Sequence, residues 1–215
     1  NSRRLLQVAS IIGYKFNVDL LNAVVENFQK RYLDELVEEE FLDYNNNEYT
    51  FSNTNIYEVV YVINLDEELR KIHTKVGEYL ETKLTTEATQ IIFDLARHFS
   101  ESDDDYKAIQ YLEKAGEKLF NEMQLRESLG SFIKCSSVLE TKGLHKWNDE
   151  DKIAKKLNIF FKIGEIYLVL ASYNEALEIF QKAETIANTF NKKSYIARSL
   201  DYLGKVYNLT AKYDQ

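Results

Sequence analysis

The chain is 215 residues long, with 45% hydrophobic and 29% charged residues, 7 glycines and no proline. This composition predicts one large or two small domains built mainly of long helices, because proline would interrupt them. The formal net charge of −8 argues against a nucleic-acid surface, and no run of about 18 apolar residues predicts a membrane span.

The first 60 residues predict three helices followed by a β-hairpin. Apolar residues recur at helical spacing from Leu5 to Ile12, and Gly13 ends that first helix. Two β-prone runs then flank an Asn-rich turn at 45–47, which is typical of a hairpin. The helices are expected at 5–12, 18–28 and 32–41, and the strands at 42–44 and 49–51. Three helices followed by a hairpin is the order of a winged helix.

From residue 56 onward the chain predicts helices alone. A break at 64–66 is expected to separate two of them, with Asp66 as a candidate N-cap. The acidic run at 103–105 suits a helix start, because negative charge is favourable at a helix N-terminus. A loop is expected at 142–151. The other helices are expected at 88–100, from 103–105 through Leu119, and at 125–141, 152–171, 174–190 and 193–213.

A repeated pattern of small and aromatic residues is the strongest signal in the chain. Gly164, Tyr167, Ala176, Phe180 and Ala183 lie at offsets 0, 3, 12, 16 and 19. Forty residues after its first occurrence the front of the pattern returns, so that Phe160, Ile163, Gly164 and Tyr167 become Leu200, Leu203, Gly204 and Tyr207. Small residues at these offsets let one helix lie close to its partner, which predicts helix-turn-helix units stacked on one another.

Segments along the whole chain resemble one family. Residues 5–16 and 33–42 are similar to the winged-helix segment of STAND-class signalling ATPases, and 51–61 with 69–73 are similar to the segment after the wing. Residues 96–99 and 107–117 resemble the first helical repeats that follow, and the glycine–aromatic pattern resembles a tetratricopeptide (TPR) repeat. This order is typical of the non-catalytic half of class III soluble adenylyl cyclases and of bacterial ATPase regulators with TPR tails.

The resemblance implies a mainly α fold in three parts. A winged-helix domain with one hairpin is expected at 1–64, a connecting helix at 65–86, and a right-handed TPR-like superhelix at 87–215 with a truncated last repeat. The family also implies an ATPase module before this segment. Its phosphate-binding loop is absent here, because the one Gly-Lys pair, Gly204-Lys205, is followed by Val206. No catalytic residue, metal ligand or cofactor is expected, and the segment is not expected to be an enzyme.

One position departs from the family. Many members carry a histidine after the wing that senses the phosphates of the bound nucleotide, and Asn53 stands at the matching position. Asparagine can donate a hydrogen bond but cannot become cationic. Nucleotide sensing through Asn53 is therefore in doubt.

The remaining chemistry-bearing residues favour structural roles. His73, His98 and His145 fall on different predicted elements without metal-ligand spacing, so ordinary helix positions are expected. Cys135 aligns with Ala183, where a small residue packs between helices. As the single cysteine it permits no internal disulfide, and no secretory signal is visible, so a cytoplasmic location is the simplest expectation.

The expected function is a regulatory interaction segment of a larger signalling ATPase or adenylyl cyclase. Its partners would be the nucleotide-binding module of the parent chain and a protein or peptide in the repeat groove, and no membrane is expected. Direct DNA contact is not expected either, because the third helix is acidic. The alternative is an ATPase–TPR transcription regulator that contacts DNA elsewhere. In the TPR register the groove is lined by Asn158, Phe161, Glu165, Leu168, Arg198, Asp201, Lys205 and Asn208. Mixed charge beside an exposed Phe161 would suit a peptide, whereas burial of Phe161 within the stack is the competing interpretation.

The last helix is expected to lack its second-helix partner. Residues 212–215 match 172–175, which precede the packing helix that begins at Ala176. The full-length chain is expected to continue past Gln215 with a small residue and, four positions further on, an aromatic residue or Leu. Without this continuation, Tyr202, Val206 and Tyr213 would be incompletely covered, and the helix would pack on another chain or fray.

Overall fold

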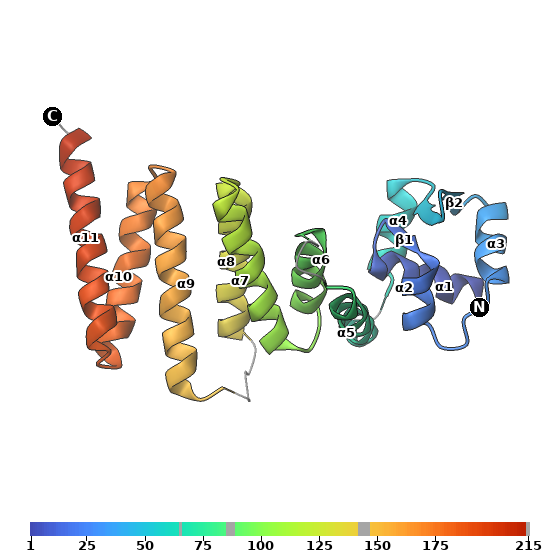
Figure 1. The fold of residues 1–215 in the computed structure, drawn as a ribbon, viewed down its shortest axis with the longest axis horizontal. Helices are drawn as coiled ribbons and strands as arrows, with labels where there is room; N and C mark the ends of the chain where they lie inside the picture. The colour runs from blue at the N-terminus through green and yellow to red at the C-terminus, as the bar shows by residue number, and fades with distance from the viewer. Residues whose placement is uncertain (65, 85–88, 142–146, 214–215) are drawn as a thin grey trace. The chain divides into compact units, whose positions relative to one another are not determined.

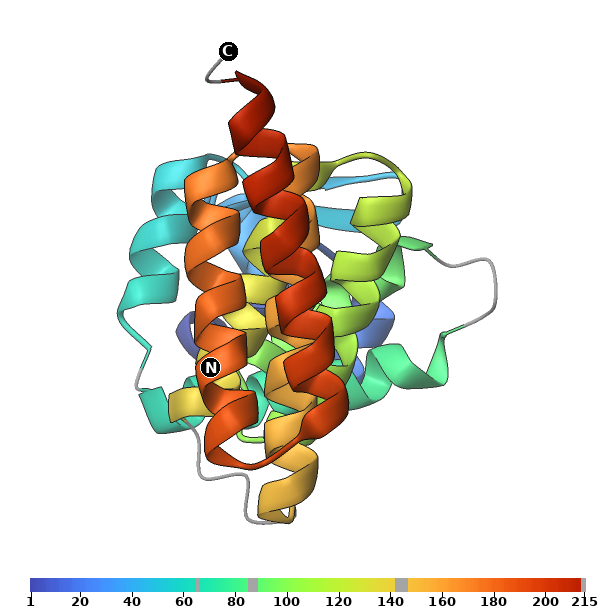
Figure 2. The same cartoon turned by 90° about the vertical axis from the view of Figure 1, so that its left-hand side faces the viewer.

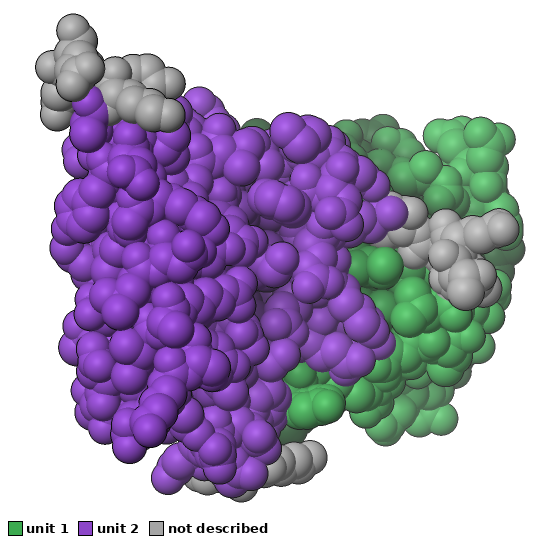
Figure 3. All heavy atoms as spheres, turned by 60° about the vertical axis from the view of Figure 1, so that its left-hand side comes forward, with its two compact units in different colours: residues 1–108 green, residues 109–215 purple. Residues whose placement is uncertain are grey.

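The computed structural model describes residues 1–64, 66–84, 89–141 and 147–213. The described chain is mainly helical, as predicted, with one small sheet (Figure 1). It divides into two compact units, residues 1–108 and 109–215, coloured separately in Figure 3. None of the helices in the described ranges is both long and apolar enough to cross a membrane.

The first unit contains the sheet and most of the shorter helices. In chain order its elements are α1 (Ser2–Ile12), β1 (Lys15–Asn17), α2 (Val18–Val24), α3 (Arg31–Glu38), β2 (Leu42–Asn45), β3 (Glu48–Phe51), α4 (Thr54–Val62), α5 (Asp66–Thr82) and α6 (Thr89–Ser100). The helix α7 (Asp105–Asn121) crosses the division between the units. The second unit continues with α8 (Leu125–Thr141), α9 (Asp149–Val169), α10 (Tyr173–Thr189) and α11 (Lys193–Tyr213).

The sheet has the strand order β1-β3-β2 and is antiparallel throughout. The predicted hairpin is confirmed: Asn46 and Asn47 have φ angles of 50° and 65°, the left-handed conformations that a two-residue hairpin turn needs. Strand β1 is an addition that the sequence did not predict. It pairs Phe16 with Tyr49, and their rings stack with centroids 5.8 Å apart.

Two helices of the first unit are shorter than expected. Helix α2 ends at Val24, because Val25 is extended at φ −95° and ψ 119°. Helix α3 ends at Glu38, and Glu40 follows with a φ of 60°. The predicted stop after α1 is confirmed, since Gly13 has a φ of 154° that side chains rarely adopt. The side chain of Asp66, the candidate cap of α5, lies outside the described residues.

One apolar core holds the first unit together. Helices α1, α2 and α3 contribute Ile11, Leu21 and Leu33, all fully buried, and the sheet contributes Phe51. Helix α5 closes the core with Val76, which is also fully buried. Helix α5, which was expected to be a connecting helix, therefore packs on the same core as the sheet.

Two buried histidines meet inside this unit, although their spacing in the sequence does not indicate a pair. The Nδ1 atoms of His73 on α5 and His98 on α6 lie 2.9 Å apart. Arg97 Nη2 lies 2.8 Å from His98 Nε2 and donates to the carbonyl of Ile12 at 2.8 Å, while the Tyr61 hydroxyl lies 3.4 Å from His73 Nε2. Burial, reinforced by Arg97 and His73, lowers the pKa of His98 to about 2. His145 lies outside the described residues.

Close helix packing repeats along the chain in the way that the glycine–aromatic pattern predicts. A phenylalanine ring covers a helical glycine in each of three places. A Cβ atom would lie 2.7 Å from Phe99 at Gly77, 2.8 Å from Phe132 at Gly116 and 2.4 Å from Phe180 at Gly164. These three contacts, called the glycine seats below, allow neighbouring helices to approach more closely than any larger side chain would permit.

The uncovered side of α11 differs from the one expected. Val206 is fully buried and Tyr202 is half-buried, with its ring stacked on Phe180 at a centroid distance of 4.6 Å, so both face the preceding helices. The expectation that these residues mark the open side is therefore wrong. The large apolar side chains exposed on the described part of α11 are those of Leu200 and Tyr207, and the side chain of Tyr213 lies outside the described residues.

Candidate functional site

Three of the predicted groove residues meet where α9 packs on α11. The guanidinium carbon of Arg198 lies 4.2 Å from the centroid of the Phe161 ring, and Arg198 Nη2 donates to Glu165 Oε1 at 3.2 Å. The Tyr202 hydroxyl donates to the same carboxylate oxygen. Burial and the Glu165 carboxylate raise the pKa of Tyr202. This cluster ties α11 to α9.

The expectation of an exposed Phe161 is wrong. The side chain is 0% exposed, with the rings of Phe180, Tyr195 and Tyr202 at centroid distances of 6.2, 6.2 and 5.7 Å. Two of these rings come from α11, so α11 covers the position that the register placed in an open groove. Phe161 therefore cannot anchor a partner in this conformation.

The other predicted residues remain accessible to different extents. Asp201 and Lys205 are exposed and form an ion pair of 2.7 Å along α11. Asn158 and Asn208 are exposed, while Leu168 is half-buried. An i,i+4 ion pair on a helix surface, such as Asp201–Lys205, contributes only about 0.3–0.5 kcal/mol to stability. Whether these residues bind a partner stays a prediction.

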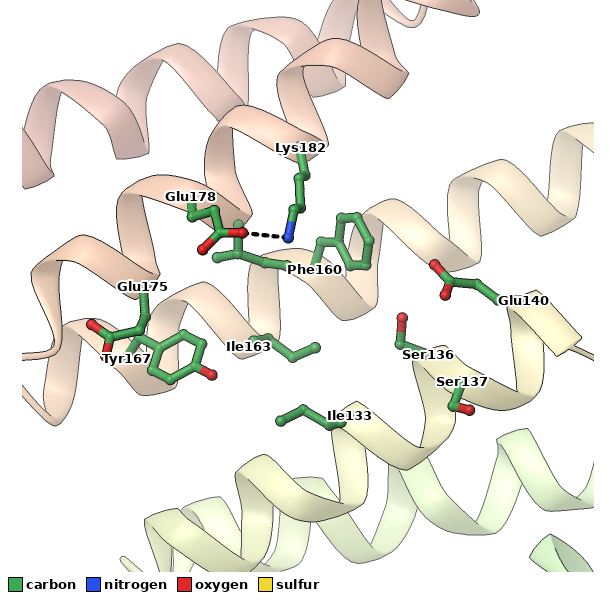
Figure 4. Close-up of a pocket in the computed structure, with 11 residues that line it drawn as sticks. Ile133, Ser136, Ser137, Glu140, Phe160, Ile163, Tyr167, Glu175, Glu178 and Lys182 are labelled. Atoms are coloured by element: carbon green, nitrogen blue, oxygen red, sulfur yellow. Dashed lines mark hydrogen bonds and ion pairs between the residues drawn. The ribbon is translucent and has the colours of Figure 1, made fainter.

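A groove of about 400 Å³ opens between α8, α9 and α10 (Figure 4). Figure 4 shows side chains from all three helices converging on it. Helix α8 supplies Ile133, Ser136, Ser137 and Glu140, α9 supplies Phe160, Ile163 and Tyr167, and α10 supplies Glu175, Glu178, Ile179 and Lys182. We call it the α8–α10 groove.

The floor of the α8–α10 groove is apolar. Phe160 and Ile163 are almost fully buried beneath it, at 6% and 4% exposure, while Ile133 remains 47% exposed at its side. Isolated exposed apolar residues are common on protein surfaces, but one beside a hollow with an apolar floor offers area that a ligand can cover.

The rim of the α8–α10 groove is predominantly acidic. The lining residues include three carboxylates, those of Glu140, Glu175 and Glu178, and one ammonium group, that of Lys182. Lys182 pairs with Glu178 at 2.7 Å, and Glu140 pairs with Lys156 at 2.8 Å. The third carboxylate, that of Glu175, leaves a net negative charge at the rim. This charge favours a cationic group on a ligand that enters the groove.

The sequence did not indicate this groove because the repeat register points to a different face of α9. Positions 160, 163 and 167 line the groove, whereas the predicted positions 158, 161 and 165 lie on another side of the same helix at 3.6 residues per turn. Ile133 is 47% exposed on α8, and its exposure is not evident from the sequence because it directly follows the buried Phe132.

Two other singled-out residues have structural roles. The Asn53 side chain accepts a hydrogen bond from the backbone N–H of Ile56 at 2.9 Å and so caps α4. Cys135 is fully buried, with its Sγ 3.7 Å from the carbonyl of Ile109, and burial raises the pKa of its thiol to about 12. Within the described ranges, no group of three or more His, Cys, Asp and Glu side chains is arranged to hold a metal ion.

No family model and no curated protein matches the chain. Among solved structures, aspartyl phosphate phosphatase F from Bacillus subtilis is similar at 14% identity, with a TM-score of 0.48 over 86% of this chain and 47% of that one. A signal transduction ATPase with numerous domains (STAND) that has a tetratricopeptide repeat sensor, from Pyrococcus horikoshii, is similar at 14% identity, with a TM-score of 0.36 over 99% of this chain and 48% of that one. The chain thus spans about half the length of these structures, and the two TM-scores, both below 0.5, establish neither a family nor a function.

Proposed function

We propose that this chain is a non-catalytic interaction segment whose helix pairs bind a polypeptide in the α8–α10 groove. The observation that carries the proposal is the combination of an apolar floor with an acidic rim across three helices. Repeat arrays present such surfaces to extended partners, because each unit adds lining residues without closing the site.

The dimensions and chemistry of the groove suit a side chain better than a metabolite. Ligand pockets usually enclose about 300–1,000 Å³ and bury most of the bound molecule. The α8–α10 groove is at the small end of that range, and side chains from three helices line it (Figure 4). One large apolar side chain can cover Phe160 and Ile133, and a neighbouring Lys or Arg can reach Glu175.

The wider context of the proposal comes from the first unit. Its order α1-β1-α2-α3-β2-β3 supports a winged helix at 1–64. We propose that a connecting helix at 65–86 and TPR-like repeats at 87–215 follow it. We propose that the first unit contacts the nucleotide-binding module of a cytoplasmic signalling ATPase or adenylyl cyclase. An ATPase–TPR transcription regulator is the alternative parent. The exposed side chains of Asp34, Glu35 and Glu38 on α3 disfavour direct DNA contact in either case.

The test is a selection of phage-displayed random peptides on the immobilised protein, followed by affinity measurement. Peptides with an aromatic or aliphatic residue next to Lys or Arg should be enriched. Ile133→Glu, on the wall of the groove, should weaken the selected peptides at least tenfold, or about 1.4 kcal/mol. Val169→Glu is the matched control, because Val169 is 53% exposed on α9 and does not line the groove.

Two further variants separate this groove from the surface predicted by the repeat register. Glu175→Lys should weaken basic peptides, whereas Asp201→Lys on α11 should leave them bound. Peptides that tolerate Ile133→Glu but lose affinity with Asp201→Lys would place the site on the predicted surface instead. Failure to select any peptide that depends on Ile133 would refute the groove as a polypeptide site.

A further inference from the structure

The face of α11 repeats the face of α9 but lacks its cover. Leu200 and Tyr207 are 53% and 54% exposed, whereas Phe160, the counterpart of Leu200 on α9, is 6% exposed. At Gly204 an added Cβ would meet nothing within 4 Å, although the counterpart Gly164 is covered by Phe180. Figure 2 shows α11 beside α10 at the end of the second unit.

The three occupied glycine seats show what chemistry fits at Gly204. At Gly77, Gly116 and Gly164 the covering atoms are ring carbons of phenylalanine, each from the following helix of its pair. In the last seat the ring is Phe180, flanked along α10 by Ala176 and Ala183, which are both fully buried. Alanine at four residues before the ring and three residues after it allows the helix backbone to pack closely against the neighbouring helix.

We propose that the exposed residues Leu200, Gly204 and Tyr207 form a docking surface for one α-helix that carries phenylalanine with alanine four residues before it and three residues after it. The ring of that helix lies over Gly204, and its apolar side covers Leu200 and Tyr207. The surface continues the α9–α10 interface of the same chain by one unit, and it shares no residue with the α8–α10 groove. Loss of one site therefore leaves the other testable.

An in-register extension of the full chain tests the proposal. Residues 212–215 align with 172–175, so a copy of residues 176–192 appended directly after Gln215 presents an α10-type helix to α11. The extended protein should show a higher urea midpoint and slower hydrogen exchange along α11 than the unextended protein. An extended protein whose appended phenylalanine is replaced by alanine should lose most of that gain.

A pair of glycine substitutions makes the test specific. Gly130, on α8, also meets nothing within 4 Å, so Gly130→Ala and Gly204→Ala should both raise the midpoint of the unextended protein through helix propensity. In the extended protein Gly204→Ala should instead cancel the gain, because the new methyl group occupies the seat of the ring, while Gly130→Ala should preserve it.

Three results would overturn the proposal. The appended helix could leave the midpoint unchanged, or it could stabilise equally with alanine in place of its phenylalanine. Alternatively, the unextended protein could dimerise in sedimentation experiments, with Gly204→Ala abolishing the dimer. That last result would assign the surface to a second copy of the chain.

Discussion

Replacing Gly164 with alanine should destabilise the second unit, although alanine is the better helix former. The added Cβ would lie 2.4 Å from two carbon atoms of the Phe180 ring. Carbon atoms pack best at about 3.5–4.0 Å, so the ring must retreat by about 1 Å. The ring is also stacked on Tyr202 at a centroid distance of 4.6 Å with an interplanar angle of 9°, which restricts that retreat.

The size of the effect follows from two opposing contributions. Overpacking a core costs about 1–3 kcal/mol, and a contact this short between buried groups belongs at the upper end. Removing a glycine from a helix interior returns about 1 kcal/mol. Gly164→Ala should therefore lower the free energy of unfolding by about 2 kcal/mol, whereas Gly130→Ala, with no atom within 4 Å, should raise it by about 0.5–1 kcal/mol.

Urea unfolding followed by circular dichroism and by tryptophan fluorescence measures both changes. Trp147 is the single tryptophan and belongs to the second unit, so its emission reports on the unit that carries Gly164. Adding Phe180→Leu to Gly164→Ala should recover part of the loss, because a smaller side chain leaves room for the methyl group. If Gly164→Ala is as stable as the wild type, the ring does not occupy the glycine seat in solution and the reasoning fails.

Three further outcomes are expected. Burial holds the pKa of His98 at about 2, below the ordinary value of 6.5, so as the pH falls from 7 to 5 the unfolded chain binds a proton that the folded chain does not. This group should then lower the free energy of unfolding by about 2 kcal/mol, and His98→Asn should remove that part of the pH dependence of the urea midpoint. The Cys135 thiol, whose pKa burial raises to about 12, should react with a disulfide reagent only as fast as the protein opens, and mild denaturant should accelerate the reaction. Glu165→Ala should lower the free energy of unfolding by about 2 kcal/mol, because Arg198 and Tyr202 both donate to this carboxylate, and the melting temperature measures the loss.

Local signals along the sequence determined most of the secondary structure. Gly13, the Asn-rich turn and Gly164 each act through the backbone or through one close neighbour, and the structure bears them out. Strand β1 escaped notice because three residues are too few to show an alternating pattern, and its existence depends on pairing with β3, more than 30 residues away.

The functional surface was harder to predict because it depends on contacts between helices. The repeat register placed Phe161 in an open groove, but Tyr195 and Tyr202 of α11 cover that face of α9. The pairing of His73 with His98 depends on how α5 meets α6, and nothing in the spacing of 25 residues indicates it. Periodicity identifies the side of a helix that is buried, whereas the residues opposite it depend on the approach of the neighbouring helix.

Arg97 sets the direction of the hydrogen bond between the two buried histidines. Arginine carries donors alone, so Arg97 must donate to His98 Nε2, and His98 must then carry its proton on Nδ1. That proton points at His73 Nδ1, which is left as the acceptor, so His73 holds its proton on Nε2, facing the Tyr61 oxygen. The guanidinium of Arg97 thus selects the tautomer of His73, a ring that it does not contact. Removing its charge would free both imidazoles to reverse, and the ¹⁵N shifts of His73 would report an exchange of tautomers inside an otherwise intact core.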